Sequence, residues 1–335
     1  MKTILISGTA GFIGSNFIYH FIENHPNYHL ISLDKLTYAG SLENLSKVKD
    51  HPRHTFIEGD ICDRILITRI FEKYNISGVI HLAAESHVDN SISNPGIFIE
   101  TNVNGTFTLI DVAYKYWMEK PFVFKKGYQD CKFLHVSTDE VYGTLGTTGL
   151  FTETTPYAPN SPYSASKASS DMLVRSYHHT YGMNTVITNC SNNYGPQQHD
   201  EKLIPTVIRK AIGGENIPIY GDGKNIRDWL YVLDHCKGID LAYHKGIYGE
   251  VYNIGGRNER NNNYIARKIC EILDELIPKE NSYKNLIQYV DDRAGHDKRY
   301  AIDANKIETD LDWKADENFE SGIVKTIEWY LNKYQ

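Results

Sequence analysis

The residues whose types and spacing best suit chemistry are a tyrosine and a lysine, Tyr163 and Lys167. Side chains four residues apart in a helix share a face, and a nearby ammonium favours the phenolate, so this tyrosine would act as a base near neutral pH. The same spacing recurs at four places that are most simply solvated residues: Tyr116/Lys120, Tyr128/Lys132, Tyr220/Lys224 and Tyr264/Lys268. Context selects Tyr163 and Lys167, because they follow Pro162 at the start of an expected helix and come after the strand-end hydroxyls Ser137-Thr138.

Two carboxylates, Asp139 and Glu140, stand directly after Thr138. Such a pair could divide general-base and general-acid work between two carboxyl groups. The acid must be protonated when it acts, which requires a pKa raised by burial or by a neighbouring carboxylate. Most Asp-Glu pairs are solvated loop residues, but this pair follows a strand end that is expected to face a cofactor.

Three glycines, Gly8, Gly11 and Gly14, lie between the first apolar run and a helical segment. They predict a tight turn, a close approach of the backbone to a pyrophosphate, and close packing of helix on strand. Asp34 ends the second expected strand 20 residues after Gly14, where a carboxylate accepts hydrogen bonds from an adenosine ribose. An acid there repels a 2′-phosphate, so we expect NAD rather than NADP, although Lys35 beside it weakens that preference.

The elements that must position these groups alternate along the first half of the chain. Short apolar runs predict strands at Thr3–Ser7, His29–Leu33, His54–Glu58, Gly78–Ala83 and Lys132–Ser137. Helical spacing predicts helices at Phe12–Asn24, Arg64–Tyr74, Ile97–Trp117 and Ser161–Gly182, the last followed by a sixth strand at Asn184–Thr188. This alternation predicts an α/β fold, a Rossmann-type doubly wound parallel sheet with helices on both faces.

From about Gly195 the segments become shorter and richer in glycine and proline. We therefore expect an NAD-binding Rossmann domain over residues 1–195 and a smaller mixed α/β lobe over most of residues 196–335. Arg227–Val232 and Val251–Ile254 predict strands followed by helices, so the chain near residues 225–260 is expected to return to the first domain. The loop Gly143–Pro162 adjoins a sheet end, where long loops are often functional.

Composition argues against several classes of protein. The 335 residues carry a formal net charge of −7 and no basic run, so no nucleic-acid partner is expected. Five scattered cysteines and 14 histidines form no CxxC or HExxH motif, which predicts reduced thiols and no metal. Neither a signal-peptide pattern nor an apolar stretch of the ~20 residues that a membrane helix needs is present, so we expect a soluble cytoplasmic protein.

The glycine triplet, Asp34, Leu82-Ala83-Ala84 and the Tyr163–Lys167 spacing resemble the extended short-chain dehydrogenase/reductase superfamily. Longer motifs resemble its dTDP-glucose 4,6-dehydratase family: Ser137–Gly143, Ser161–Asp171, Asn189–Pro196, Arg227–Val232 and Asp292–Asp303. The resemblance runs nearly end to end. It departs at Thr9 and Ala294, where a glycine and a proline are expected, and over Lys120–Asp130, which is not matched.

The resemblance implies an NAD-dependent hydro-lyase that converts dTDP-glucose to dTDP-4-keto-6-deoxyglucose, in the synthesis of rhamnose or a related deoxysugar. Tyr163 would take the proton of the C4 hydroxyl while Thr138 holds the C4 oxygen. Glu140 would remove the C5 proton, and Asp139 would protonate the departing C6 hydroxyl. The resemblance also implies a homodimer joined through the helices Ile97–Trp117 and Ser161–Gly182 in a four-helix interface.

Further site residues are carried over by resemblance or position. Those expected around the cofactor, besides Tyr163 and Lys167, are Gly8, Gly11, Phe12, Ile13, Gly14, Asp34, Lys35, Thr37, Asp60, Ile61, Leu82, Ala83, Ala84, Thr101 and Asn193. Those expected around the nucleotide sugar, besides Thr138, are Ser86, Asn192, Lys202, Leu203, Tyr220, Arg227, Asn262, Arg293, His296 and Tyr300. Arg227 suits a diphosphate, because a guanidinium pairs with phosphate oxygens in a bidentate way. Several of the others, such as Tyr220 and His296, are equally compatible with packing or surface roles.

Two other functions remain open on the sequence. Another enzyme of the superfamily, a UDP-sugar 4-epimerase or a UDP-glucuronate decarboxylase, would keep Tyr163 and Lys167 but would not need Asp139 and Glu140 as a pair. A non-catalytic dinucleotide-sensing protein would have lost some of these residues. The sequence does not distinguish thymine from uracil or cytosine as the nucleotide base.

Overall fold

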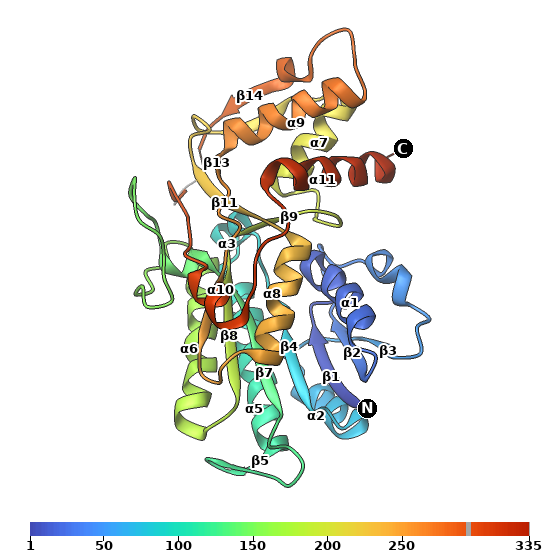
Figure 1. Cartoon of the computed structure of the whole chain (residues 1–335), viewed down its shortest axis with the longest axis vertical. Helices are drawn as coiled ribbons and strands as arrows, with labels where there is room; N and C mark the ends of the chain where they lie inside the picture. Colours follow the sequence, from blue (N-terminus) through green and yellow to red (C-terminus); the bar gives the residue numbers. More distant parts are fainter. Residues whose placement is uncertain (293–295, 335) are drawn as a thin grey trace.

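The computed structural model describes residues 1–292 and 296–334. Its centre is a seven-stranded sheet, shown in Figure 1, in which every paired strand is parallel. In spatial order the strands are β12 (Val251–Ile254), β8 (Thr185–Cys190), β7 (Lys132–Thr138), β4 (Gly78–His81), β1 (Lys2–Ser7), β2 (Tyr28–Asp34) and β3 (His54–Glu58). The order runs outward from β1 in both directions, which confirms the doubly wound fold.

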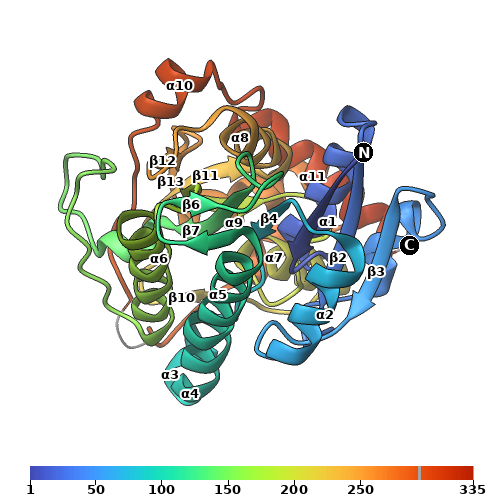
Figure 2. The same ribbon diagram turned by 90° about the horizontal axis from the view of Figure 1, so that it is seen from below.

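Helices cover both faces of the sheet, as Figure 2 shows from below. Alternate residues of β1 face opposite cores, because successive side chains of a strand point to opposite sides. Ile4 and Ile6 pack in a core with α1 (Phe12–Asn24) and α8 (Val232–Lys245), whereas Leu5 packs on the other side. Helices on that second face are α2 (Arg64–Tyr74), α5 (Thr106–Trp117) and α6 (Pro162–Tyr181).

The helix predicted over Ile97–Trp117 is interrupted. Short helices α3 (Val88–Ser93) and α4 (Pro95–Phe98) lead into a π-helical segment, η2 (Ile99–Gly105), and only then does α5 begin. The Asn102 side chain in this segment accepts a hydrogen bond from the Glu85 backbone N–H at 2.8 Å. It also donates one to the Glu85 backbone carbonyl at 3.0 Å. The π-helical turns thus bind the loop after β4, and such turns often occur at functional sites.

The C-terminal lobe lies above the sheet in Figure 1 and has its own apolar core. It contains two small sheets, β9 (Asn192–Tyr194) with β11 (Ile226–Tyr231) and β13 (Glu259–Asn261), and β10 (Ile217–Tyr220) with β14 (Ile287–Val290). Its helices are α7 (Leu203–Gly213), α9 (Asn262–Leu276) and α11 (Phe319–Tyr334), while α10 (Asn305–Leu311) packs against α8 and β12. Short 3-10 segments are η1 (Leu42–Val48), η3 (Asp139–Tyr142) and η4 (Tyr283–Leu286).

One of the two later strands expected to return to the first domain does not join its sheet. The strand over Arg227–Tyr231 pairs with β9 and β13 instead, whereas Val251–Ile254 joins the central sheet as β12. The reason lies in its side chains: Trp229 and Tyr231 pack in the core of the C-terminal lobe and Leu230 in that of the first domain. The strand therefore connects the two cores.

The stretch Lys120–Asp130, which the resemblance does not match, contains part of a small hairpin. Strands β5 (Met118–Lys120) and β6 (Val123–Phe124) pair antiparallel at the end of the molecule opposite the C-terminal lobe (Figure 1). No helix among the described residues has both the length and the apolarity needed to cross a membrane.

Candidate active site

A cavity lies at the carboxyl ends of the central strands, and the glycine loop forms one of its walls. Gly8 has a φ of +76°, and a Cβ there would come within 2.6 Å of the Ala83 backbone nitrogen. A Cβ on Gly14 would come within 2.0 Å of the Gly8 carbonyl oxygen. Helix α1 starts after Gly11, which supplies no side-chain cap to the first backbone N–H groups. The loop and helix end therefore fit the pyrophosphate of a dinucleotide.

Asp34 lines the cavity at the end of β2. One of its oxygens accepts a hydrogen bond from the Ala10 backbone N–H at 2.8 Å, and the other accepts from Leu36 N–H at 2.9 Å. Lys35 points its ammonium to Asp60, with 2.7 Å between Nζ and Oδ2. The Lys35 ammonium, whose charge would weaken the preference for NAD, is thus paired with the Asp60 carboxylate.

Helix α6 carries both Tyr163 and Lys167. Ser161 and Ser164 form a reciprocal capping box at its start, and Pro162 occupies the first turn, so the sequence fixes where the helix begins. Lys167 donates a hydrogen bond to the Val136 carbonyl at 2.8 Å. Burial lowers the pKa of Lys167 to about 8, against the opposing effect of the nearby Asp171.

The Tyr163 phenol lines the cavity together with the Thr138 side chain. Its pKa is held well above the ordinary value, first by burial and next by the negative charge of Glu140. The spacing with Lys167 led us to expect the opposite direction. Near neutral pH the phenol is therefore protonated.

Asp139 and Glu140 stand where β7 ends and η3 begins, on the cavity wall. Burial raises the pKa of Asp139 well above its usual range, and the charges of Glu140 and Asp228 add to this effect. Its Oδ2 atom is buried and has no hydrogen-bond partner among the described residues. The pKa of Asp139 is thus raised, as the role of a general acid requires, and the charge of Glu140 contributes to the rise.

A buried polar network behind Lys167 was not found from the sequence. His135 Nε2 lies 3.4 Å from Lys167 Nζ and 3.2 Å from Asp171 Oδ1. Ser137 and Tyr157 donate hydrogen bonds to the other Asp171 oxygen at 2.8 and 3.0 Å. Burial raises the pKa of Asp171 to about 7. Its position four residues after Lys167, on the same face of α6, is the signal that was available.

The structure brings most of the expected site residues to this cavity. All five catalytic candidates line it, as do the cofactor candidates Gly8, Gly11, Phe12, Ile13, Gly14, Asp34, Lys35, Thr37, Asp60, Ile61, Leu82, Ala83, Ala84, Thr101 and Asn193. Of the substrate candidates, Ser86, Asn192 and Lys202 line it together with Thr138. Arg293 lies outside the described residues.

The remaining substrate candidates lie away from the cavity wall: Leu203, Tyr220, Arg227, Asn262, His296 and Tyr300. Arg227 and Tyr300 nevertheless lie close to the acid pair. The guanidinium stacks 4.3 Å from the centre of the Tyr300 ring, and its charge lowers the pKa of Asp139 against the larger effect of burial. Tyr220 is 42% exposed at the end of β10, and Asn262 begins α9, so both belong to the outer part of the lobe.

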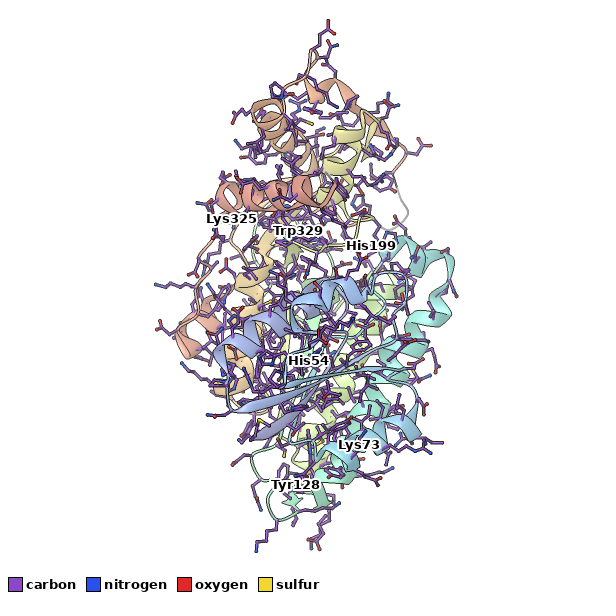
Figure 3. The ribbon with its side chains drawn as sticks, turned by 90° about the vertical axis from the view of Figure 1, so that its right-hand side faces the viewer. His54, Lys73, Tyr128, His199, Lys325 and Trp329 are labelled. Atoms are coloured by element: carbon purple, nitrogen blue, oxygen red, sulfur yellow. The ribbon has the colours of Figure 1, made fainter. Side chains whose placement is uncertain are left out.

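Several cavity residues were not foreseen, among them Glu85, His199 and Glu201. Figure 3 shows His199 at nearly the level of Trp329 in the C-terminal lobe and well above His54 in the central sheet. The Glu201 carboxylate lies 3.7 Å from Lys202 Nζ and 3.8 Å from His87 Nε2. These loop residues have no spacing pattern, and only the folded chain brings them together.

Comparison with known proteins gives a consistent assignment. The family model for GDP-mannose 4,6 dehydratase matches residues 5–326. A dTDP-glucose 4,6-dehydratase of Salmonella typhimurium is 54% identical, over 99% of this chain and 93% of the relative.

Two solved structures of dTDP-glucose 4,6-dehydratases with NAD bound are also similar. The enzyme from Bacillus anthracis is 44% identical with a TM-score of 0.87, over 99% of this chain and 97% of the other. That from Streptomyces venezuelae is 42% identical with a TM-score of 0.89, over 98% and 97%. Together with the cavity's glycine loop, its tyrosine and lysine, and its two acids, these matches show that the chain belongs to the dTDP-glucose 4,6-dehydratase family.

Proposed function

We propose that this chain removes water from dTDP-glucose to give dTDP-4-keto-6-deoxyglucose, using bound NAD. The observation that carries the proposal is the acid pair Asp139 and Glu140, set beside Tyr163 in the cavity, with the pKa of Asp139 raised. Bound NAD supplies a hydride acceptor that later returns the hydride, so the reaction has no net redox change.

Tyr163 is the base for the C4 hydroxyl. Tyr163 and Thr138 line the same cavity, where both hydroxyls can reach one sugar oxygen, and Lys167 holds positive charge one helical turn away. Burial and Glu140 raise the pKa of Tyr163. Positive charge near the phenol would lower this pKa and so favour proton removal from the C4 hydroxyl.

Glu140 and Asp139 divide the elimination between them. A 4-ketone acidifies the C5 hydrogen, and the Glu140 carboxylate removes it. Asp139, kept protonated by burial and by its two carboxylate neighbours, gives its proton to the departing C6 hydroxyl. The pair would have no such task in a 4-epimerase or a decarboxylase, and this favours dehydration over those alternatives.

In this proposal the C-terminal lobe holds the nucleotide through five residues: Tyr220, Arg227, Asn262, His296 and Tyr300. The chain also forms a homodimer through α5, α6 and their partner copies. Exposed apolar side chains on these helices and on α4 support that interface: Ile97, Phe107 and Met172 are 40%, 41% and 50% exposed. Sedimentation of a Phe107→Glu variant as a monomer, against a wild-type dimer, is the expected result.

Mass spectrometry of products formed from dTDP-, UDP- and CDP-glucose tests the function. We expect loss of one water from dTDP-glucose, in preference to the other two. A product with the mass of the substrate and an inverted C4 would instead identify an epimerase.

A further inference from the structure

A cluster of histidines around one carboxylate lies at the far end of α1 and α8 from the cofactor cavity. Asp240 on α8 is its centre. His20 Nε2 lies 2.9 Å from Asp240 Oδ2, His25 Nε2 lies 2.9 Å from both carboxylate oxygens, and His244 Nδ1 lies 2.8 Å from Oδ1. The three imidazoles thus converge on one carboxylate from two helices.

We propose that His25, Asp240 and His244, with His20 at their edge, bind one divalent transition-metal ion of the zinc class. One ligand atom from each of these first three residues lies within 4.8 Å of the others. Zinc takes imidazole nitrogens and carboxylate oxygens at about 2.0–2.2 Å, which separates tetrahedral ligands by roughly 3.4 Å. The present separations of 2.8–2.9 Å between the carboxylate and each nitrogen need to widen by about half an ångström.

The local sequence explains how the ligands come together. Asp240 and His244 are four residues apart in α8, so they share a face of that helix. His25 caps the C-terminus of α1 and stacks on His244, with ring centres 4.3 Å apart. Phe21 packs against both rings, and Tyr28 meets the His244 ring edge-on, so aromatic side chains form the base of the cluster.

Electrostatics at this position favour a cation. Helices α1 and α8 both end here, and the C-terminal end of a helix carries partial negative charge. Asp240 adds a carboxylate whose two oxygens contact all three imidazoles. The side chains of His20, His25 and His244 are 18–27% exposed, so an ion can reach them from solvent.

The site is distinct from the cofactor cavity, whose described lining includes none of these four residues. The 13 residues of α1 separate the phosphate loop from the cluster by about 20 Å. A bound ion would join the ends of α1 and α8, which pack against each other in the core beneath the phosphate loop. We therefore expect it to stabilise the fold and to leave turnover unchanged.

Titration calorimetry with zinc chloride tests the proposal on NAD-loaded protein that has been dialysed against a chelator. We expect one tight site per chain, weakened at least tenfold in His25→Ala and in His244→Ala. His179→Ala, which removes an exposed histidine on α6, is the matched control and should bind as the wild type does.

Two further readouts keep the test decisive. Zinc should raise the melting temperature of the wild type and of His179→Ala but not that of His244→Ala, and His244→Ala should retain wild-type dehydratase turnover. Anomalous scattering from zinc-soaked crystals should place the ion between His25, Asp240 and His244. Absence of tight binding in the wild type, or tight binding that survives both histidine substitutions, would overturn the proposal.

Discussion

Replacement of Asp171 by asparagine is expected to move the alkaline limb of the pH–rate profile to lower pH. The carboxylate acts on Lys167 across His135: Asp171 Oδ1 and Lys167 Nζ lie 3.2 and 3.4 Å from the same Nε2 atom, and so at most about 6.6 Å apart. At an effective dielectric constant of about 20, this separation corresponds to an attraction of ~2.5 kcal/mol, or roughly 1.8 pKa units.

The direction of the shift follows from the two effects on Lys167. Burial lowers its pKa to about 8, and Asp171 opposes that lowering. The pKa of Asp171 is itself raised to about 7 by burial, so its carboxylate is mostly charged at the pH where Lys167 titrates. Without this charge the ammonium loses its proton one to two units earlier, between about pH 6 and pH 7. Because protonated Lys167 supports proton removal by Tyr163, activity falls over the same range.

The assay is the initial rate with saturating dTDP-glucose from about pH 6 to about pH 9. Asp111→Asn is the matched control, since it removes another buried carboxylate, bound to Arg64 and Lys115, well away from Lys167. In Asp111→Asn the alkaline limb of the pH–rate profile should lie at the same pH as in the wild type. If the limb of Asp171→Asn coincides with that of the wild type while overall activity merely drops, Asp171 is structural and the electrostatic argument is refuted.

Three further outcomes are expected. Asp34→Ala should lose the preference for NAD over NADP that the wild type shows in calorimetry; a wild type with equal affinity for both would remove the role given to Asp34. Tyr163→Phe should reduce turnover by a factor of about 100 or more while nucleotide-sugar binding changes little, and near-normal turnover would show that the base lies elsewhere. Gly14→Ala should weaken NAD binding and lower the melting temperature, because its Cβ would meet the Gly8 carbonyl oxygen at 2.0 Å. Gly146→Ala, where nothing lies within 4 Å of the added Cβ, is the control for adding a methyl group and should leave NAD binding intact.

Local patterns in the sequence were sufficient to predict the fold and the principal residues that line the cavity. The strand, glycine loop and helix at Gly8–Gly14 are contiguous, and strand ends of a parallel sheet meet at one edge, so Asp34, Thr138 and Tyr163 could be expected together. The strand at Arg227–Tyr231 pairs with β9 and not with the central sheet, and its side chains enter both cores. A short apolar strand does not indicate in the sequence which of two cores its faces serve.

Long-range properties were beyond the sequence argument. The direction of the Tyr163 pKa depends on burial and on Glu140, which spacing does not reveal. The π-helical turns before α5 depend on Asn102 reaching the Glu85 backbone. His25 and Asp240 lie far apart in the sequence, so their contact forms no local metal-binding motif.

The central claim, that Glu140 and Asp139 carry out an elimination after Tyr163 has acted, is tested most directly with dTDP-glucose deuterated at C4. The wild type should release a 4-keto-6-deoxy product that carries the deuterium at C6. Glu140→Gln should still oxidise C4 in a single turnover but retain the C6 hydroxyl, with the absorbance of reduced nicotinamide persisting on the protein. Asp139→Asn should slow water loss less completely, because solvent can supply the proton. Wild-type product that keeps its C6 hydroxyl, or a Glu140→Gln variant that eliminates water at the normal rate, would contradict the account.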